Sequence, residues 1–128
     1  MTTDKFMNIA IFFAVTAVAL GALGAHALKE ILASSQLQSF ETGVRYQFLH
    51  ALAILLLALN DEKFNHQLKR SLYLMSAGIC CFSFSIYLLS LQNTFGVSLS
   101  FLGPITPIGG LLLISAWIML FFSIKKQA

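Results

Sequence analysis

The sequence predicts an all-α integral membrane protein, a four-transmembrane-helix bundle with both termini in the cytoplasm. Three observations predict it: the composition, four long apolar segments, and the placement of the basic residues. Of the 128 residues, 58% are hydrophobic and 10% are charged, whereas soluble domains are about 45–50% apolar and about 25% charged. The length suits a single domain, residues 1–128.

Each predicted span is an apolar segment close to the roughly 20 residues that a helix needs to cross the hydrocarbon core. The first lies between Lys5 and Lys29, and the second ends at the polar run Asn60–Lys63. The second is the shortest, although its helix could begin upstream, through Leu37–Phe40. The third follows a pair of basic residues, and the fourth opens at Pro104, which the first turn of a helix tolerates. The predicted spans cover about residues 6–28, 44–59, 71–91 and 104–124.

The first segment has one competing interpretation, a cleaved signal peptide. Lys5 would be its basic start, and Ala25-His26-Ala27 has small residues on either side, as a cleavage site does. The apolar stretch is longer than the central region of a typical signal peptide. We therefore expect a retained first span.

The basic residues predict the orientation, because cytoplasmic loops of membrane proteins carry an excess of Lys and Arg. With four spans, the N-terminus, the second loop and the C-terminus share one side of the membrane. That side carries six of the eight basic residues: Lys5, Lys63, Lys69, Arg70, Lys125 and Lys126. The other two loops carry only Lys29 and Arg45. We therefore predict that both termini are cytoplasmic.

Unusual polar residues gather in the outer half of the predicted bundle. A helix that starts near Asn8 has risen about 27 Å by His26. The second helix runs inward and places His50 about 7–8 Å below Arg45, so the two histidines are expected at a similar depth. Ionisable groups within spans are costly and are therefore functional candidates. The candidate outer-side polar cluster comprises His26, Lys29, Glu41, Arg45, Tyr46, Gln47, His50 and Tyr87.

The same residues also have a structural interpretation, which we favour over a ligand pocket. Glu41 and Arg45 have the i,i+4 spacing of an ion pair on one helix. Lys29 could extend to the lipid headgroups. Each histidine could hydrogen-bond a neighbouring polar side chain and hold the bundle in register.

Small and hydroxyl residues predict where the helices pack closely. A stripe of small residues on the first span comprises Ala10, Ala14, Ala17, Gly21 and Ala25. A polar stripe on the third span comprises Tyr73, Ser76, Cys80, Ser83, Tyr87 and Ser90. The residues singled out for helix packing are Gly21, Ala25, Gly109 and Gly110.

Four sequence segments carry a resemblance to a known family. They are GALGAHALK at 21–29, F.TGVRYQFLHALA at 40–53, IYLLS at 86–90, and GPITPIGG at 103–110 followed by Trp117. With them, nearly the whole chain resembles the YgdD-like family, also called domain-of-unknown-function family 423. The resemblance implies a small four-span protein of the bacterial inner (plasma) membrane. It implies no activity, and no catalytic or binding residue.

Among the function classes, we expect first a non-enzymatic membrane protein that supports membrane or envelope integrity, or a partner protein. The sequence has no P-loop, no G-x-S-x-G and no H-E-x-x-H motif. The expected partners are the lipid bilayer and either a second copy or another membrane protein. We expect no nucleic acid, no cofactor and no metal.

Two other classes stay open. A binding module would hold a lipid, a quinone or haem in an outer polar pocket, with His26 and His50 as axial ligands in the case of haem. A small transporter or channel comes third. No Asp or Glu lies deep within a predicted span, which disfavours proton coupling. A lipid-modifying enzyme built on Ser90 and a histidine has no supporting motif.

Overall fold

The structure is a computed structural model that describes residues 3–126, and the long elements within them are all helices. In the first half, α1 (Asp4–Ala25), the short α2 (Ala27–Ile31) and α3 (Ser34–Leu59) follow one another. In the second half, α4 (Gln67–Ile79) passes through a π-helical turn at Cys80–Phe84 into α5 (Ser85–Phe95). The last helix is α6 (Ile105–Phe121), and short 3₁₀ turns occupy Asp61–Lys63 and Ser100–Leu102.

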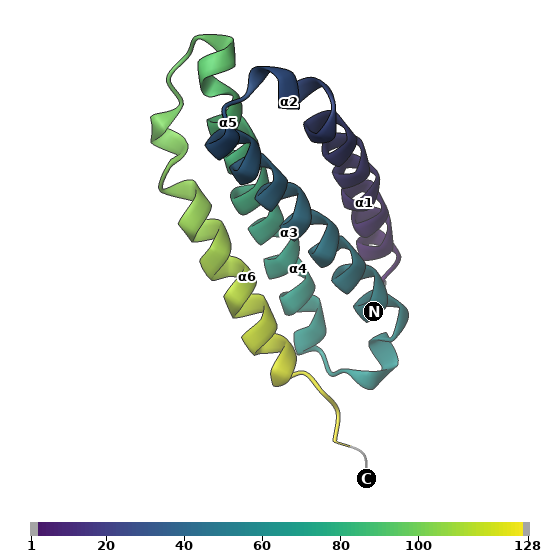
Figure 1. Cartoon of the computed structure of the whole chain (residues 1–128). Coiled ribbons are helices and arrows are strands. Elements are labelled where there is room, and N and C mark those ends of the chain that lie inside the picture. Colours follow the sequence, from purple (N-terminus) through teal and green to yellow (C-terminus); the bar gives the residue numbers. More distant parts are fainter. Residues whose placement is uncertain (1–2, 127–128) are drawn as a thin grey trace.

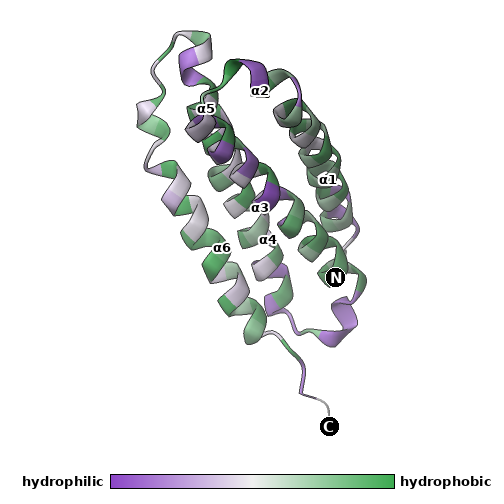
Figure 2. Cartoon of the chain, in the orientation of Figure 1, coloured by the Kyte–Doolittle hydropathy of each residue, from purple (hydrophilic) through white to green (hydrophobic). Residues whose placement is uncertain are grey.

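Four helical segments are long and apolar enough to cross a membrane: Asp4–Ala25, Ser34–Leu59, Gln67–Phe95 and Ser100–Phe121. Figure 2 shows hydrophobic residues along all of them, with hydrophilic residues mainly at the ends of the bundle and within α3. The predicted all-helical architecture with four spans is thus confirmed at the level of helix length and composition.

None of the four helical segments has the bounds of its predicted span, and the first two show a local cause of the difference. The second begins at Ser34, because the Gln36 side chain accepts a hydrogen bond from the Ala33 N–H at 3.2 Å and so starts the helix ahead of the apolar run. The first ends at Ala25, because the backbone of His26 (φ −116°, ψ −85°) leaves the helical region. The predicted first span, residues 6–28, is therefore interrupted at His26.

The helices pack in antiparallel order, with α1 against α3 and α6 against α4 and the π turn. In Figure 1, α3 and the α4–α5 helix lie between α1 and α6. Both described ends of the chain lie at one end of the bundle (Figure 1). We call this the terminal end, and we call the other the α2 end.

The bundle buries a continuous apolar core and exposes further apolar side chains. The core residues include Phe6, Ile54, Leu72, Met75 and Ile79, all fully buried. A second cluster at the α2 end gathers Leu28, Leu32, Phe40 and Tyr87. Large exposed hydrophobic residues occur on every long helix, as expected of a surface in contact with lipid rather than water.

The chain after α6 pairs with the loop between α3 and α4 at the terminal end. The Asn65 N–H donates to the Ser123 carbonyl at 2.7 Å, and the Lys125 N–H donates to the Lys63 carbonyl at 3.1 Å. On the other side of this end, the Lys5 ammonium donates to the Tyr73 hydroxyl and so joins α1 to α4. Basic residues from separate parts of the chain therefore share this end.

Candidate functional site

A glutamine side chain joins three helices in the middle of the bundle. Gln47 of α3 is fully buried. Its Nε2 donates to the Phe13 carbonyl of α1 at 2.9 Å and to Thr16 Oγ1 at 2.7 Å. Its Oε1 accepts from the Tyr87 hydroxyl of α5 at 2.7 Å. Both amide hydrogens and the amide oxygen are used, and a flipped amide would place two oxygens against each other at Phe13.

His50 lies one turn further along α3 and faces α6. Its Nε2 lies 3.0 Å from Nε1 of Trp117, an indole nitrogen that can only donate. Nδ1 therefore carries the ring proton, which it donates to the Tyr46 carbonyl at 2.8 Å. The imidazole is buried, and both of its nitrogens are engaged.

This arrangement does not suit haem ligation by two histidines. His50 has no nitrogen lone pair free for iron, because the Nε2 lone pair accepts the hydrogen bond from the Trp117 N–H and Nδ1 is protonated. His26 is exposed at the junction of α1 and α2. His50 bonds Trp117 of α6, whereas His26 follows the last residue of α1. The helices α1 and α6 lie on opposite sides of α3 and the α4–α5 helix (Figure 1).

We expect the His50→Leu substitution to shift the fluorescence of Trp117, because the indole loses its hydrogen-bond acceptor. The chain contains one tryptophan, so the signal has a single source. The emission maximum should move to shorter wavelength, and stability should fall by about 0.6 kcal/mol, the average for hydrogen bonds within membrane proteins. His26→Leu is the matched control and should leave the spectrum unchanged. An unchanged spectrum for His50→Leu would contradict the assigned hydrogen bond.

The backbone of α6 approaches the π turn at Gly109. A Cβ there would lie 2.3 Å from the Phe82 nitrogen, so only glycine fits. Beside this contact, the Ser85 hydroxyl reaches the carbonyls of Cys81 and Phe82 and lies 2.6 Å from Thr106 Oγ1. A serine hydroxyl has one proton, which goes to a carbonyl of the π turn, so Thr106 donates to Ser85. This hydroxyl pair ties α6 to α5.

A second close contact joins α3 to the helix that contains the π turn. Ser83 donates to the Gly43 carbonyl at 2.8 Å. A Cβ at Gly43 would lie 2.7 Å from Cε1 of Tyr87, whose ring therefore stands over this glycine. The absence of a side chain at Gly43 thus lets Tyr87 reach Gln47.

The eight residues of the candidate polar cluster do not form one site. Three are buried in the networks described above: Gln47, His50 and Tyr87. Five are exposed: His26, Lys29, Glu41, Arg45 and Tyr46. Within residues 3–126, Glu41 and Arg45 form no ion pair despite their i,i+4 spacing. The structure therefore separates a buried network that joins helices from an exposed set toward the α2 end.

The residues singled out for packing lie in different surroundings. Gly21 faces α3, where a Cβ would lie 3.3 Å from Val44 Cγ1, and Gly109 faces the π turn. At Gly110 a Cβ would have no neighbour nearer than 3.9 Å. Ala25 is exposed, and it is Gly24 that is buried against α3.

The π turn divides the polar stripe of the third span. Tyr73 and Cys80 are exposed, whereas Ser83, Tyr87 and Ser90 are buried. A π turn holds one more residue than an α turn, so the stripe rotates about the helix axis where it crosses the turn. Sequence reasoning that assumed a uniform helix could not place the two halves of the stripe on different faces.

Two partners of the buried network lie outside the candidate cluster, Thr16 and Trp117. Each is a hydrogen-bonding side chain within an apolar span, and that signal alone could have added Thr16 to the cluster. For Trp117 the partner, His50, lies far away in the sequence, and no local pattern connects them.

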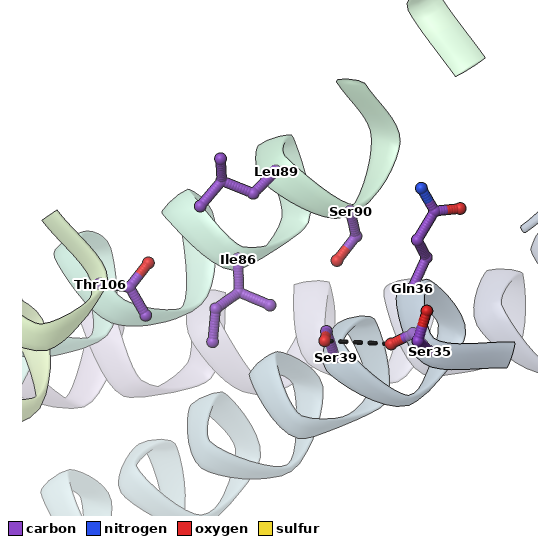
Figure 3. A pocket seen from close by; sticks show the side chains of 7 residues that line it. All are labelled: Ser35, Gln36, Ser39, Ile86, Leu89, Ser90 and Thr106. Carbon is purple, nitrogen blue, oxygen red and sulfur yellow. Dashed lines mark hydrogen bonds between the residues drawn. The ribbon is translucent and has the colours of Figure 1, made fainter. Parts of the chain in front are cut away.

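A shallow pocket opens at the α2 end, between the start of α3 and α5. Its volume is about 280 Å³, and it is lined by Ser35, Gln36, Ser39, Ile86, Leu89, Ser90 and Thr106 (Figure 3). The Ser39 hydroxyl donates to the Ser35 carbonyl of its own helix at 3.1 Å. These side chains can hydrogen-bond a neutral polar group. Within residues 3–126, no serine or threonine hydroxyl bonds a histidine, so a nucleophile and base are not paired.

Four apolar helices held together by buried polar contacts define the class of this protein: a helical membrane protein with four candidate spans. The family model described as "Protein of unknown function (DUF423)" matches residues 20–110, and the chain belongs to this family. The predicted resemblance is thereby confirmed.

The relatives are bacterial membrane proteins of the same length class. The UPF0382 membrane protein YwdK of Bacillus subtilis is 37% identical, over 94% of this chain and 96% of its own. The UPF0382 membrane protein SAB0533 of Staphylococcus aureus is 36% identical, over 96% and 97%. A UPF0382 membrane protein of Haemophilus influenzae is 34% identical, over 97% and 96%. No solved structure matches the chain.

Proposed function

We propose that this chain is a non-enzymatic multi-pass protein of the bacterial inner (plasma) membrane that supports the integrity of the membrane or of a partner protein. The observation that carries the proposal is the use of the buried polar side chains. Among residues 3–126, every buried side-chain nitrogen and oxygen has a hydrogen-bond partner. Gln47, Ser71 and Ser83 each bond a different helix from their own. Polar groups used in this way hold a bundle together and are not free to react with a substrate.

We propose that both termini are cytoplasmic. Six of the eight basic residues belong to the three chain segments that meet at the terminal end, and such an excess favours the cytoplasmic side. Lys63 and Lys125 lie side by side there through their backbone hydrogen bond.

The partner of this protein would contact its apolar outer surface. α6 lies at the edge of the bundle and exposes a row of large hydrophobic side chains on its outer side, Leu111, Ile114, Ile118 and Phe121. Lipid, a second copy, or another membrane protein would each be accommodated by such a surface.

A deletion strain tests the proposal. Cells without this chain are expected to admit a membrane-impermeant dye faster than their parent does. A copy fused at its C-terminus to a green fluorescent protein should restore the barrier and should fluoresce, because this reporter matures in the cytoplasm. Copies with His26→Ala or Lys29→Ala should restore it equally well, since no reaction depends on these side chains.

Three outcomes would each contradict a different part of the proposal. An unaltered barrier in the deletion strain argues against a supporting role. Failure of either substituted copy at a normal protein level argues for catalysis or transport. A dark fusion that restores the barrier argues against a cytoplasmic C-terminus.

A further inference from the structure

A groove follows the outer side of the contact between α1 and α3. Its volume is about 350 Å³. Val18 and Gly21 line it from α1, and Phe48 and Leu49 line it from α3, together with one charged residue, Arg45. Val18, Phe48 and Leu49 are exposed, so the groove opens toward the lipid. We call it the α1–α3 groove.

Arg45 has no ion-pair partner within residues 3–126, and its side chain is exposed. It lies 14 residues before the end of α3 at Leu59, which is about 21 Å along the helix axis. In a hydrocarbon core of about 30 Å, a long side chain at this depth reaches the interface by extending toward the α2 end. An unpaired guanidinium there calls for an anion, and its planar fork matches phosphate oxygens.

The order of groups along α3 follows the order of groups in a phospholipid. Phe48 and Leu49 lie about one turn deeper than Arg45, and Glu41 lies about one turn nearer the α2 end, at about 5.4 Å per turn. An acyl chain, a phosphate and a headgroup ammonium follow one another in the same direction. Glu41 is exposed and has no ion-pair partner among the described residues.

We propose that the α1–α3 groove binds a phospholipid with an ammonium headgroup. One acyl chain lies along Phe48 and Leu49, the phosphate bonds Arg45, and the ammonium pairs with Glu41. The phosphate of a phospholipid without the ammonium group still pairs with the Arg45 guanidinium. The Glu41 carboxylate then has no positive group to pair with. The groove is therefore selective by charge as well as by shape, a property that goes beyond the proposed supporting role and does not depend on it.

Native mass spectrometry of the detergent-purified full chain tests this proposal. The probes are phosphatidylethanolamine and phosphatidylglycerol with identical acyl chains. The wild-type chain should retain the ethanolamine lipid preferentially. Arg45→Gln should weaken the binding of both lipids roughly tenfold, because a charge-assisted hydrogen bond to phosphate is lost. Glu41→Gln should weaken only the ethanolamine lipid and abolish the preference. Arg70→Gln, which removes a cation at the terminal end, is the matched control and should bind as the wild type does.

Circular dichroism verifies that each variant is folded. Equal binding of the two lipids by the wild-type chain would overturn the proposal, and so would an Arg45→Gln variant that binds like the control. If Arg45→Gln does not fold, the proposal is still tested by two measurements: the lipid preference of the wild-type chain, and the loss of that preference in Glu41→Gln. Because the readout is lipid retention in vitro, failure here leaves the barrier experiment in cells unaffected.

Discussion

The Gly109→Ala variant is expected to lose about 3 kcal/mol or more of its free energy of unfolding in detergent. The added Cβ would lie 2.3 Å from the Phe82 nitrogen and 2.7 Å from its Cα. Both atoms belong to the backbone of the π turn, so no side-chain rotation relieves the overlap, and α6 must move away. Denaturant unfolding followed by circular dichroism measures the loss. Gly109→Leu should prevent formation of a stable bundle.

Gly110→Ala is the matched control for this experiment. A Cβ at Gly110 has only Phe82 Cδ2 nearby, at 3.9 Å, an ordinary contact. Alanine has a higher helix propensity than glycine by up to about 1 kcal/mol, so the control should be as stable as the wild type or more stable. Equal destabilisation of the two variants would show that helix flexibility at this dipeptide, and not close contact with the π turn, explains the glycines.

The four spans could be predicted because span length and apolar composition are local properties of the sequence. The bounds were less predictable. Nothing at His26 marks a helix end, since neither glycine nor proline stands there; the chain turns at this point, and Leu28 and Leu32 pack into the cluster around Phe40. That packing involves residues distant in sequence, and a periodicity argument has no access to it.

The sequence was sufficient to predict which residues of the candidate site are important. It was not sufficient to predict the hydrogen-bond partner of each. A glutamine and a histidine within an apolar span require hydrogen-bond partners. The position of Gln47 and His50 in such a span was therefore enough to select them as candidates. Which helix each would face depended on the rotation of α3, and the two residues face different neighbours. The π turn adds a further shift that sequence spacing does not reveal.

We expect Gln47→Ala to destabilise the bundle by about 3 kcal/mol, through loss of a buried side chain and of its three hydrogen bonds. The side chain joins α1, α3 and α5, so its removal weakens contacts between all three. Unfolding in denaturant measures this loss. Gln38→Ala is the control, since Gln38 is an exposed glutamine on the same helix, and its stability should stay within about 0.5 kcal/mol of the wild type.

A double-mutant cycle separates the hydrogen bonds from the packing. Gln47→Met keeps the approximate volume and removes the bonds, and we expect it to cost about 1–2 kcal/mol because the Tyr87 hydroxyl is left buried without an acceptor. Adding Tyr87→Phe to Gln47→Met removes that unpaired hydroxyl and should recover about 1 kcal/mol, although Tyr87→Phe alone is destabilising. If the two substitutions were simply additive, the bond between Tyr87 and Gln47 would contribute nothing to stability. A recovery would instead show that this polar contact fixes the position of α5 against α3, as expected where lipid offers no competing hydrogen bonds.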